Sequence, residues 1–140
     1  MAVKASREFQ IFAKPVGAIC NLDCHYCYYL QKELLYPQTQ SFRMPDDLLE
    51  EYIVQQIAIA PETTINFFWH GGEPTILGLD YFRKIVELQR KHQPPDRRIA
   101  MAYRRTACSS MTTGAAFLPQ NILPSGSALT VHRRCTTRTV

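Results

Sequence analysis

Three cysteines within one short loop, Cys20, Cys24 and Cys27, constrain the fold of this chain more than any other feature. Their spacing is Cys-x3-Cys-x2-Cys, and an aromatic residue, Tyr26, directly precedes the last of them. A [4Fe–4S] cluster has four irons and is normally held by four thiolates, so a three-thiolate loop leaves one iron open to another ligand. The loop is therefore a candidate cluster site with one ligand missing.

Other interpretations of these cysteines remain open. Structural zinc takes four ligands, commonly as two separated pairs, and no second Cys pair or His-x3-5-His follows at suitable spacing. His25 lies inside the loop but has no obvious reach as a fourth ligand. A disulfide framework would leave one of the three cysteines unpaired, and nothing indicates secretion. The spacing favours a cluster over zinc, disulfides or incidental cysteines.

A second motif follows about 45 residues downstream of the cysteine loop. Residues 64–74 read Thr-Ile-Asn-Phe-Phe-Trp-His-Gly-Gly-Glu-Pro, an apolar, aromatic strand that ends in a turn. Gly71 and Gly72 lack Cβ, so the backbone there can take positive φ and let a ligand approach closely. Pro74 fixes its own φ and favours an extended Glu73. Alone this is an ordinary turn, but paired with the cysteine loop it becomes specific.

Together these residues resemble the radical S-adenosylmethionine (SAM) superfamily, whose signature is Cys-x3-Cys-x-aromatic-Cys and whose second strand ends in a Gly-Gly-Glu-Pro-like turn. The stretch from Ala13 to Leu30 is similar to the anaerobic sulfatase-maturating enzymes. The same is true of Lys32-Glu33, of Leu35-Tyr36-Pro37 and of Trp69-His70-Gly71-Gly72-Glu73-Pro74-Thr75. The resemblance covers about residues 8 to 100 and stops there.

The resemblance implies two cofactors, a [4Fe–4S] cluster and SAM. Cys20, Cys24 and Cys27 would bind three irons, and the amino and carboxylate groups of SAM would chelate the fourth. The methionine end of SAM would be lined by Gly71, Gly72, Glu73 and Pro74, and Tyr26 would pack beside the cluster. In the family, the reduced cluster cleaves SAM to methionine and a 5′-deoxyadenosyl radical, which abstracts hydrogen from the substrate. No residue of this chain is assigned as catalytic.

The subgroup resemblance also implies partners. The substrate would be a Cys or Ser side chain of a sulfatase, oxidised to formylglycine, and a flavodoxin or ferredoxin would donate electrons. Another peptide-modifying radical SAM enzyme, or a non-catalytic iron–sulfur or metal-binding module, remains an alternative. Because thiols stay reduced in the cytoplasm, a cytoplasmic location is expected. The N-terminus lacks the apolar core of a signal peptide and no stretch approaches a membrane span, so no membrane partner is expected.

The first hundred residues alternate strand and helix patterns, which indicates an α/β fold. Phe9, Ile11 and Ala13 predict a first strand that delivers the cysteine loop from its C-terminal end, where active-site loops of barrels belong. Residues 64–70 predict a second strand. We expect the N-terminal fragment of a radical SAM partial (β/α)6 TIM-like barrel, followed by a non-native or disordered C-terminal tail.

Two helices are expected between and after these strands. The first spans 47–60, with an apolar face formed by Leu48, Leu49, Tyr52, Ile53 and Ile57. Its start carries Asp47 and, three residues later, Glu50, which can form a capping box. The second spans 80–92 and ends before two prolines. The basic residues from 83 to 98 predict a solvated helix face rather than a nucleic-acid site.

The composition changes near residue 100. Residues 1–100 hold all 12 acidic residues and a net charge of −1, whereas residues 101–140 hold five arginines and no acidic residue. The net basicity therefore comes from the tail and does not by itself indicate a nucleic-acid partner. We predict a partial radical SAM core over residues 1–100 and a basic, acid-free tail, out of frame or disordered, over residues 101–140. Cys108 and Cys135, in this tail, are poor candidates for cluster ligands.

The genetic code offers a specific explanation of the tail. Residues 104–110, back-translated with permitted codons and read one nucleotide earlier, can spell Gln-Thr-Asn-Gly-Val-Leu-Leu, which resembles the third strand of the family. Residues 129–140, shifted identically, can spell Asp-Gly-Pro-Pro-Pro-Leu-His-Asp-Ala-Tyr-Arg. The hypothesis is a slip of the reading frame near residue 100. A natural basic tail, disordered or partner-binding, is the alternative. Because later barrel strands are missing, we expect poor solubility and weak or no turnover for the chain alone.

Overall fold

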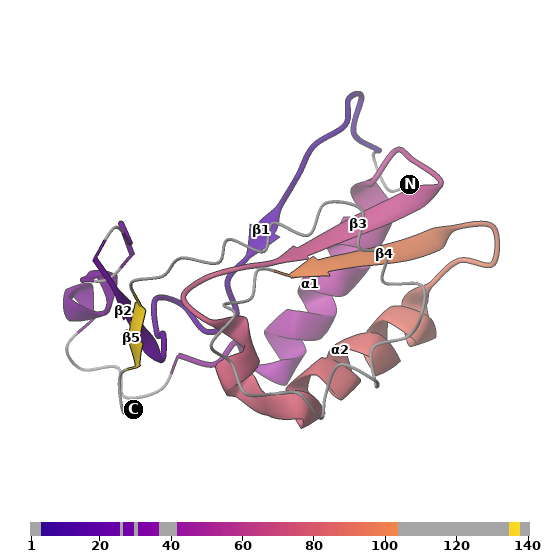
Figure 1. Ribbon diagram of the computed structural model, residues 1–140. Helices are drawn as coiled ribbons and strands as arrows, with labels where there is room; N and C mark the ends of the chain where they lie inside the picture. Colours follow the sequence, from indigo (N-terminus) through magenta and orange to yellow (C-terminus); the bar gives the residue numbers. More distant parts are fainter. Residues whose placement is uncertain (1–3, 26, 30, 37–41, 104–134, 138–140) are drawn as a thin grey trace.

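The computed structural model describes residues 4–25, 27–29, 31–36, 42–103 and 135–137. Its main body has two layers, a parallel sheet and a pair of helices that cover one face of it (Figure 1). The elements in chain order are β1 (Phe12–Ala13), β2 (Leu22–Cys24), the 3-10 helix η1 (Lys32–Leu35), α1 (Asp46–Ile59), β3 (Thr64–Trp69), the 3-10 helix η2 (Pro74–Leu77), α2 (Gly78–His92), β4 (Arg98–Tyr103) and β5 (Cys135–Thr137).

The sheet has the strand order β1-β3-β4, and both pairs are parallel. Phe12 lies opposite Phe68, and Thr64 lies opposite Arg98, so β3 is the central strand. A helix makes each crossover, α1 between β1 and β3 and α2 between β3 and β4. Two successive strand–helix units with neighbouring parallel strands are how an α/β barrel begins. The predicted α/β class is therefore confirmed.

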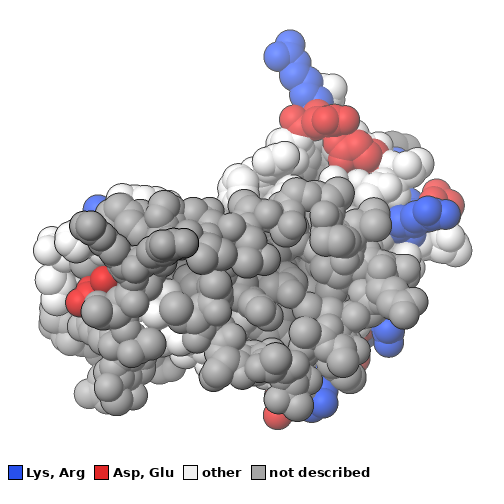
Figure 2. Space-filling model, in the orientation of Figure 1, with Lys and Arg blue, Asp and Glu red and all other residues white. Residues whose placement is uncertain are grey.

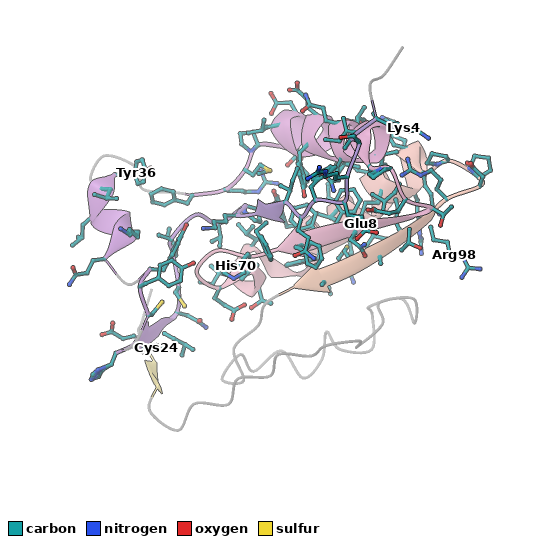
Figure 3. All side chains as sticks on the ribbon, turned by 90° about the horizontal axis from the view of Figure 1, so that it is seen from above. Lys4, Glu8, Cys24, Tyr36, His70 and Arg98 are labelled. Atoms are coloured by element: carbon teal, nitrogen blue, oxygen red, sulfur yellow. The ribbon has the colours of Figure 1, made fainter. Side chains whose placement is uncertain are left out.

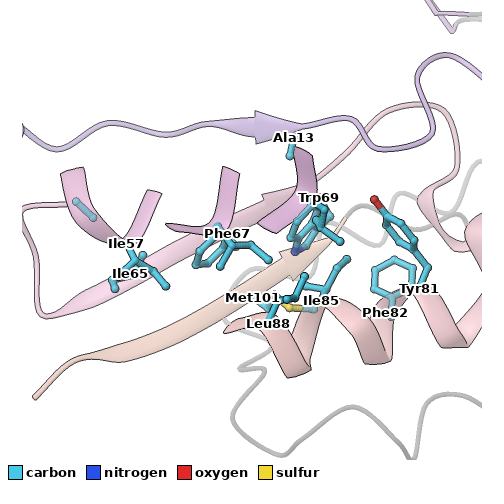
Figure 4. Packing of buried hydrophobic residues seen from close by; sticks show 13 residues of the cluster. Ala13, Ile57, Ile65, Phe67, Trp69, Tyr81, Phe82, Ile85, Leu88 and Met101 are labelled. Carbon is cyan, nitrogen blue, oxygen red and sulfur yellow. The ribbon is translucent and has the colours of Figure 1, made fainter. Parts of the chain in front are cut away.

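The core lies between the sheet and the two helices (Figure 4). Along β3, Ile65, Phe67 and Trp69 alternate with more exposed residues and point into this layer. They meet apolar residues from both helices: Leu49, Ile53 and Ile57 of α1, and Tyr81, Phe82, Ile85 and Leu88 of α2. Each large apolar side chain buried in this way contributes about 1.5–3 kcal/mol. The packing fixes β3, and with it the turn at its C-terminal end.

The opposite face of the sheet is more open. Phe12 is 52% exposed there, and its ring lies 5.3 Å from that of Phe68, centroid to centroid. On the face of the molecule seen in Figure 2, Lys and Arg side chains stand next to Asp and Glu side chains across the coloured surface.

Neither helix of the described chain has the length and apolar character that crossing a bilayer requires.

The predicted elements match the structure in most of the core. The strand expected at 64–70 is β3, the helix at 80–92 is α2, and the helix at 47–60 is α1, with shifts of one or two residues at their ends. The capping box is wrong, because Pro45 is the N-cap residue, Asp47 lies inside the helix, and no side chain caps it. Leu48 is also wrong as a core residue, since it is 48% exposed.

The first strand is shorter than predicted. Only Phe12 and Ala13 pair with β3, whereas residues 9–11 lie outside any strand. The Ala5 N–H donates a hydrogen bond of 2.9 Å to the carbonyl of Ile59 at the end of α1. This contact draws the incoming chain toward the helix, which explains why the ladder with β3 begins late.

Strand β4 crosses the boundary expected at residue 100. It pairs with β3 over its whole length, from Arg98 to Tyr103. Strand β5 pairs antiparallel with β2 and brings Cys24 opposite Cys135 in the register. Residues 104–134, including Cys108, lie outside the described residues. The domain boundary and the frame slip therefore stay predictions.

Candidate functional site

The cysteine loop begins directly after β1. Gly17, with φ 60°, donates its N–H to the carbonyl of Lys14 at 3.0 Å, and the Ile19 N–H donates to Val16 at 3.3 Å. These tight turns reverse the chain at the end of the strand, while the Val16 side chain is buried beneath them. The loop therefore starts from a fixed point at the C-terminal end of β1, as the sequence predicted.

The three predicted cluster ligands lie along this loop. Cys24 is buried, whereas Cys20 and Cys27 are partly exposed, and all three are thiols. The Cys27 N–H donates to the carbonyl of Cys24 at 2.8 Å, which closes a turn between these two cysteines. Figure 3 shows Cys24 at the end of the molecule away from α1. Tyr26, the predicted aromatic neighbour of the cluster, lies outside the described residues.

Within the described parts of the chain, no three His, Cys, Asp or Glu side chains are grouped closely enough to hold a metal ion. A single zinc ion needs its ligands to converge on one point. A [4Fe–4S] cluster is larger, and each thiolate binds a different iron. Three thiols in one loop are the kind of donor set that such a cluster binds.

The Gly-Gly-Glu-Pro turn is hydrogen-bonded to the cysteine loop. The Gly72 N–H donates to the carbonyl of Gly17 at 3.0 Å, and the Glu73 N–H donates to the carbonyl of Ile19, also at 3.0 Å. Directly before the turn, the His70 N–H donates to the carbonyl of Ala13 at 2.8 Å. The structure thus brings together the two motifs that the sequence separates by about 45 residues.

The glycines are needed for this contact. A Cβ on Gly72 would lie 2.0 Å from the carbonyl oxygen of Ile19, and one on Gly71 would lie 2.7 Å from that of Gly17. Gly71 also has φ 119°, a conformation that other residues rarely adopt. The sequence predicted that a ligand would approach the backbone here. In the structure, the backbone of the cysteine loop makes this close approach.

Glu73 is fully buried and holds the turn from within. Its Oε1 accepts hydrogen bonds from the Thr75 N–H at 3.2 Å and from the Thr75 hydroxyl at 2.8 Å. It is the N-cap residue of η2, and the buried Pro74 follows it. A buried carboxylate needs such partners because it has lost its hydration. Thr75 was not predicted as a partner from the sequence, although its place at the start of the helix was a usable signal.

The two residues before the turn have separate positions. Trp69 is buried in the core, where its ring centroid lies 5.7 Å from that of Tyr52. His70 lies on the open face of the sheet, and its ring is edge-on to Phe12 at 5.8 Å. Trp69 is therefore a packing residue rather than part of the site.

A contact that the sequence analysis missed joins Lys14 to Tyr29. The Lys14 Nζ donates to the Tyr29 hydroxyl and lies 4.2 Å from the centroid of the tyrosine ring. Tyr29 comes two residues after Cys27. The available signal was that both residues flank the cysteine loop, with Lys14 directly after β1.

Comparison with known proteins identifies the family. The model of the radical SAM superfamily matches residues 15–110, which include the cysteine loop, the glycine turn and β4. The chain belongs to the radical SAM superfamily. Enzymes of this superfamily use a [4Fe–4S] cluster and SAM. The resemblance inferred from the two motifs is confirmed.

Curated relatives show which enzymes of the superfamily the chain is similar to. The chain is 41% identical over 87 residues to the serine-type anaerobic sulfatase-maturating enzyme of Bacteroides thetaiotaomicron, covering 62% of this chain and 21% of the relative. It is 32% identical over 111 residues to the cysteine-type enzyme of Clostridium perfringens, covering 79% of this chain and 30% of the relative. The chain therefore spans less than a third of the length of these relatives.

A solved structure shows the same fold. The structure described as native anSMEcpe with bound AdoMet aligns with a TM-score of 0.54 and 34% identity, covering 66% of this chain and 25% of the other. This supports the prediction of a barrel fragment. No comparison tests the role of any single residue, so the assignments to Cys20, Cys24, Cys27 and the glycine turn stay predictions.

Proposed function

We propose that this chain is the cluster-binding and SAM-binding part of an anaerobic sulfatase-maturating enzyme. The observation that carries the proposal is the pair of hydrogen bonds from Gly72 and Glu73 to the cysteine loop. A cofactor that spans the cluster and the turn needs both at a fixed separation, and these bonds supply it. Positioning of this kind is the protein's main contribution to cofactor chemistry.

The residues present fit the cofactor pair. Cys20, Cys24 and Cys27 would hold three irons, and partial exposure of the first and last leaves room for a cluster at the loop surface. The cluster supplies the electron that cleaves SAM. The turn from Gly71 to Pro74 would face the methionine end of SAM, with its backbone held by the loop. Tyr26 would pack beside the cluster.

The relatives support a peptide substrate. They are named as serine-type and cysteine-type sulfatase-maturating enzymes, and one matching structure contains a Cp18Cys peptide. We propose that the complete enzyme oxidises a Cys or Ser side chain of a sulfatase to formylglycine. A flavodoxin or ferredoxin would donate the electrons, and the reduced thiols favour the cytoplasm as the location.

Anaerobic reconstitution of the full chain with iron and sulfide tests the proposal. We expect about four irons per chain and an EPR signal of the reduced cluster that changes when SAM is added. Cys24→Ala should lose most of the bound iron, whereas the matched variant Cys108→Ala should keep it. A reduced cluster with an EPR signal indifferent to SAM would contradict the proposal and favour a non-catalytic iron–sulfur module.

A further inference from the structure

Lys14 lies beside three parts of the site. It is the residue directly after β1, and its carbonyl accepts the N–H of Gly17 that starts the cysteine loop. Its Cβ lies 3.6 Å from the position a Cβ would take on Gly71, so the start of its side chain lies beside the glycine turn. Its Nζ then reaches Tyr29, beyond the end of the loop.

The contact between Lys14 and Tyr29 consists of two interactions. The Lys14 Nζ contacts both the hydroxyl and the ring face of Tyr29, and the Tyr29 ring packs edge-on against Tyr28 with centroids 5.0 Å apart. A lysine ammonium is attracted to the electron-rich face of a tyrosine ring, and more strongly where water is excluded. Tyr29 follows Cys27 by two residues, so this contact restrains the segment that follows the cysteine loop.

The charge of Lys14 has no carboxylate partner within the described residues, where the ion pairs involve other side chains. Within that part of the chain, the Lys14 ammonium is thus a positive charge without an ion pair, held at Tyr29, two residues after Cys27. Adding an electron to a cluster held by three thiolates makes it more negative. A cation nearby stabilises the reduced cluster more than the oxidised one, which raises its midpoint potential.

We propose that Lys14 is a positioning residue for the cluster site: it ties the segment after Cys27 to the end of β1 and would bias a bound cluster toward its reduced form. This rests on the proposed function in one respect, the presence of the cluster. The restraint of the loop belongs to the polypeptide itself and can be measured without metal.

The first experiment uses the metal-free full chain and hydrogen exchange. In Lys14→Met, amide exchange across residues 20–29, including the Cys27 N–H, should be roughly three- to tenfold faster. Lys14→Arg keeps a cation over the ring and should exchange at the native rate. Lys4→Met is the matched control, because it removes the same charge from an exposed residue far from Cys24 (Figure 3). Unchanged exchange in Lys14→Met, or an equal increase in Lys4→Met, would overturn the proposal.

The second experiment uses the reconstituted chain and a dithionite titration followed by EPR. The midpoint potential should be more negative in Lys14→Met than in the native chain, and restored in Lys14→Arg. A potential that does not move in Lys14→Met also overturns the proposal. If the native chain takes up no iron, the proposed function fails, while hydrogen exchange still decides whether Lys14 positions the loop. The two failures are therefore distinguishable.

Discussion

Gly72 has less room for a side chain than any other described glycine. Its added Cβ would lie 2.0 Å from the Ile19 carbonyl oxygen and 2.5 Å from the Ile19 carbonyl carbon, both backbone atoms that cannot rotate away. We expect Gly72→Ala to push the cysteine loop off the turn and to lower the free energy of unfolding by about 1–3 kcal/mol. Iron content after reconstitution should fall as well, because the three thiols no longer keep their positions.

Gly78→Ala is the matched control for that prediction. Gly78 has φ 78° and ψ 171°, but no atom lies within 4 Å of its added Cβ. This backbone conformation is strained for alanine by about 1–3 kcal/mol, so the loss of stability should be similar. Iron content should stay at the native level. Equal iron content in the two variants would show that the close contact at Gly72 does not position the loop.

The sequence predicts the residues of the candidate site but not their contacts. Local spacing marks Cys20, Cys24 and Cys27, whose role as cluster ligands stays a prediction, and the absence of a Cβ marks Gly71 and Gly72 as points of close approach. The group that approaches the glycines could not be predicted, because their neighbours come from a loop more than 50 residues away. The bridge from Lys14 to Tyr29 was missed for the same reason, since it depends on how the loop folds back.

Arg97 fastens the end of α1 to the sheet. Its guanidinium donates to the carbonyls of Ile57, Ala60 and Glu62 at distances from 2.6 to 3.1 Å. The last carbonyls of a helix have no partner within the helix, so the arginine satisfies groups that would otherwise need water. Hydrogen bonds from a charged donor contribute about 1.5–3 kcal/mol, and Arg97→Met should lower the free energy of unfolding by about that amount.

Urea unfolding of Arg98→Met provides the comparison for Arg97→Met. Arg98 is the next residue, is exposed, and uses its backbone N–H rather than its side chain to bond Thr63. Its substitution should leave the midpoint nearly unchanged. Arg97→Lys should recover only part of the loss, because an ammonium cannot reach all three carbonyls with the geometry of the guanidinium. Equal midpoints for the two Met variants would contradict this role of Arg97.

Glu50 links α1 to α2 in a way that depends on pH. Its Oε1 accepts from Lys91 Nζ and lies beside His92 Nε2, both at 2.7 Å. The hydrogen bond from Lys91, then that from His92, lowers the pKa of Glu50 to about 2. A carboxyl with a lowered folded pKa stabilises the fold above its unfolded pKa, about 4.3, and loses that stabilisation as the pH falls toward 2.

The difference in urea midpoint between the native chain and Glu50→Gln should therefore be largest above about pH 5 and shrink toward pH 2. It should also shrink with added salt, because these side chains are partly exposed. Glu51→Gln is the control, since Glu51 bonds only to Gln55 of its own helix among the interactions described. A difference that is constant from pH 7 to 3 would argue against the bridge between the helices.

Elements were predictable where the hydrophobic period was strong. Strand β3 and the two helices bury regular apolar faces, and their ends agree with the sequence within one or two residues. The capping box failed because the N-cap of α1 is Pro45, two residues before Asp47. Strand β1 is short because an edge strand depends on its partner's register and on contacts such as Ala5 with Ile59, neither of which appears in local sequence.

The described sheet leaves one face and two outer strands open. Phe12 on β1 is 52% exposed and packs against Phe68, whereas the helices cover only the other face. Exposed aromatic surface beside an unpaired strand edge favours association between chains. Phe12→Thr should therefore lower ANS fluorescence and raise the monomer fraction in size-exclusion chromatography. The control Tyr28→Thr, which removes an exposed ring from the cysteine loop side, should change the monomer fraction less. Equal effects of the two variants would show that association depends on exposed aromatic rings in general and not on the open face of the sheet.

The sequence of the chain changes in character after β4. Strand β4 pairs with β3 as far as Tyr103, as a third barrel strand should, yet no acidic residue occurs beyond position 100. We propose that the frame slips at about this point. Reading one nucleotide earlier allows Gln-Thr-Asn-Gly-Val-Leu-Leu directly after Tyr103 and a later segment with two aspartates, which restores both the strand-end sequence and the missing acidic residues. The nucleotide sequence of the gene decides the matter. The codons must permit both segments in the same shifted frame, and a gene in which no single-base shift yields them would leave residues 101–140 as a true basic tail.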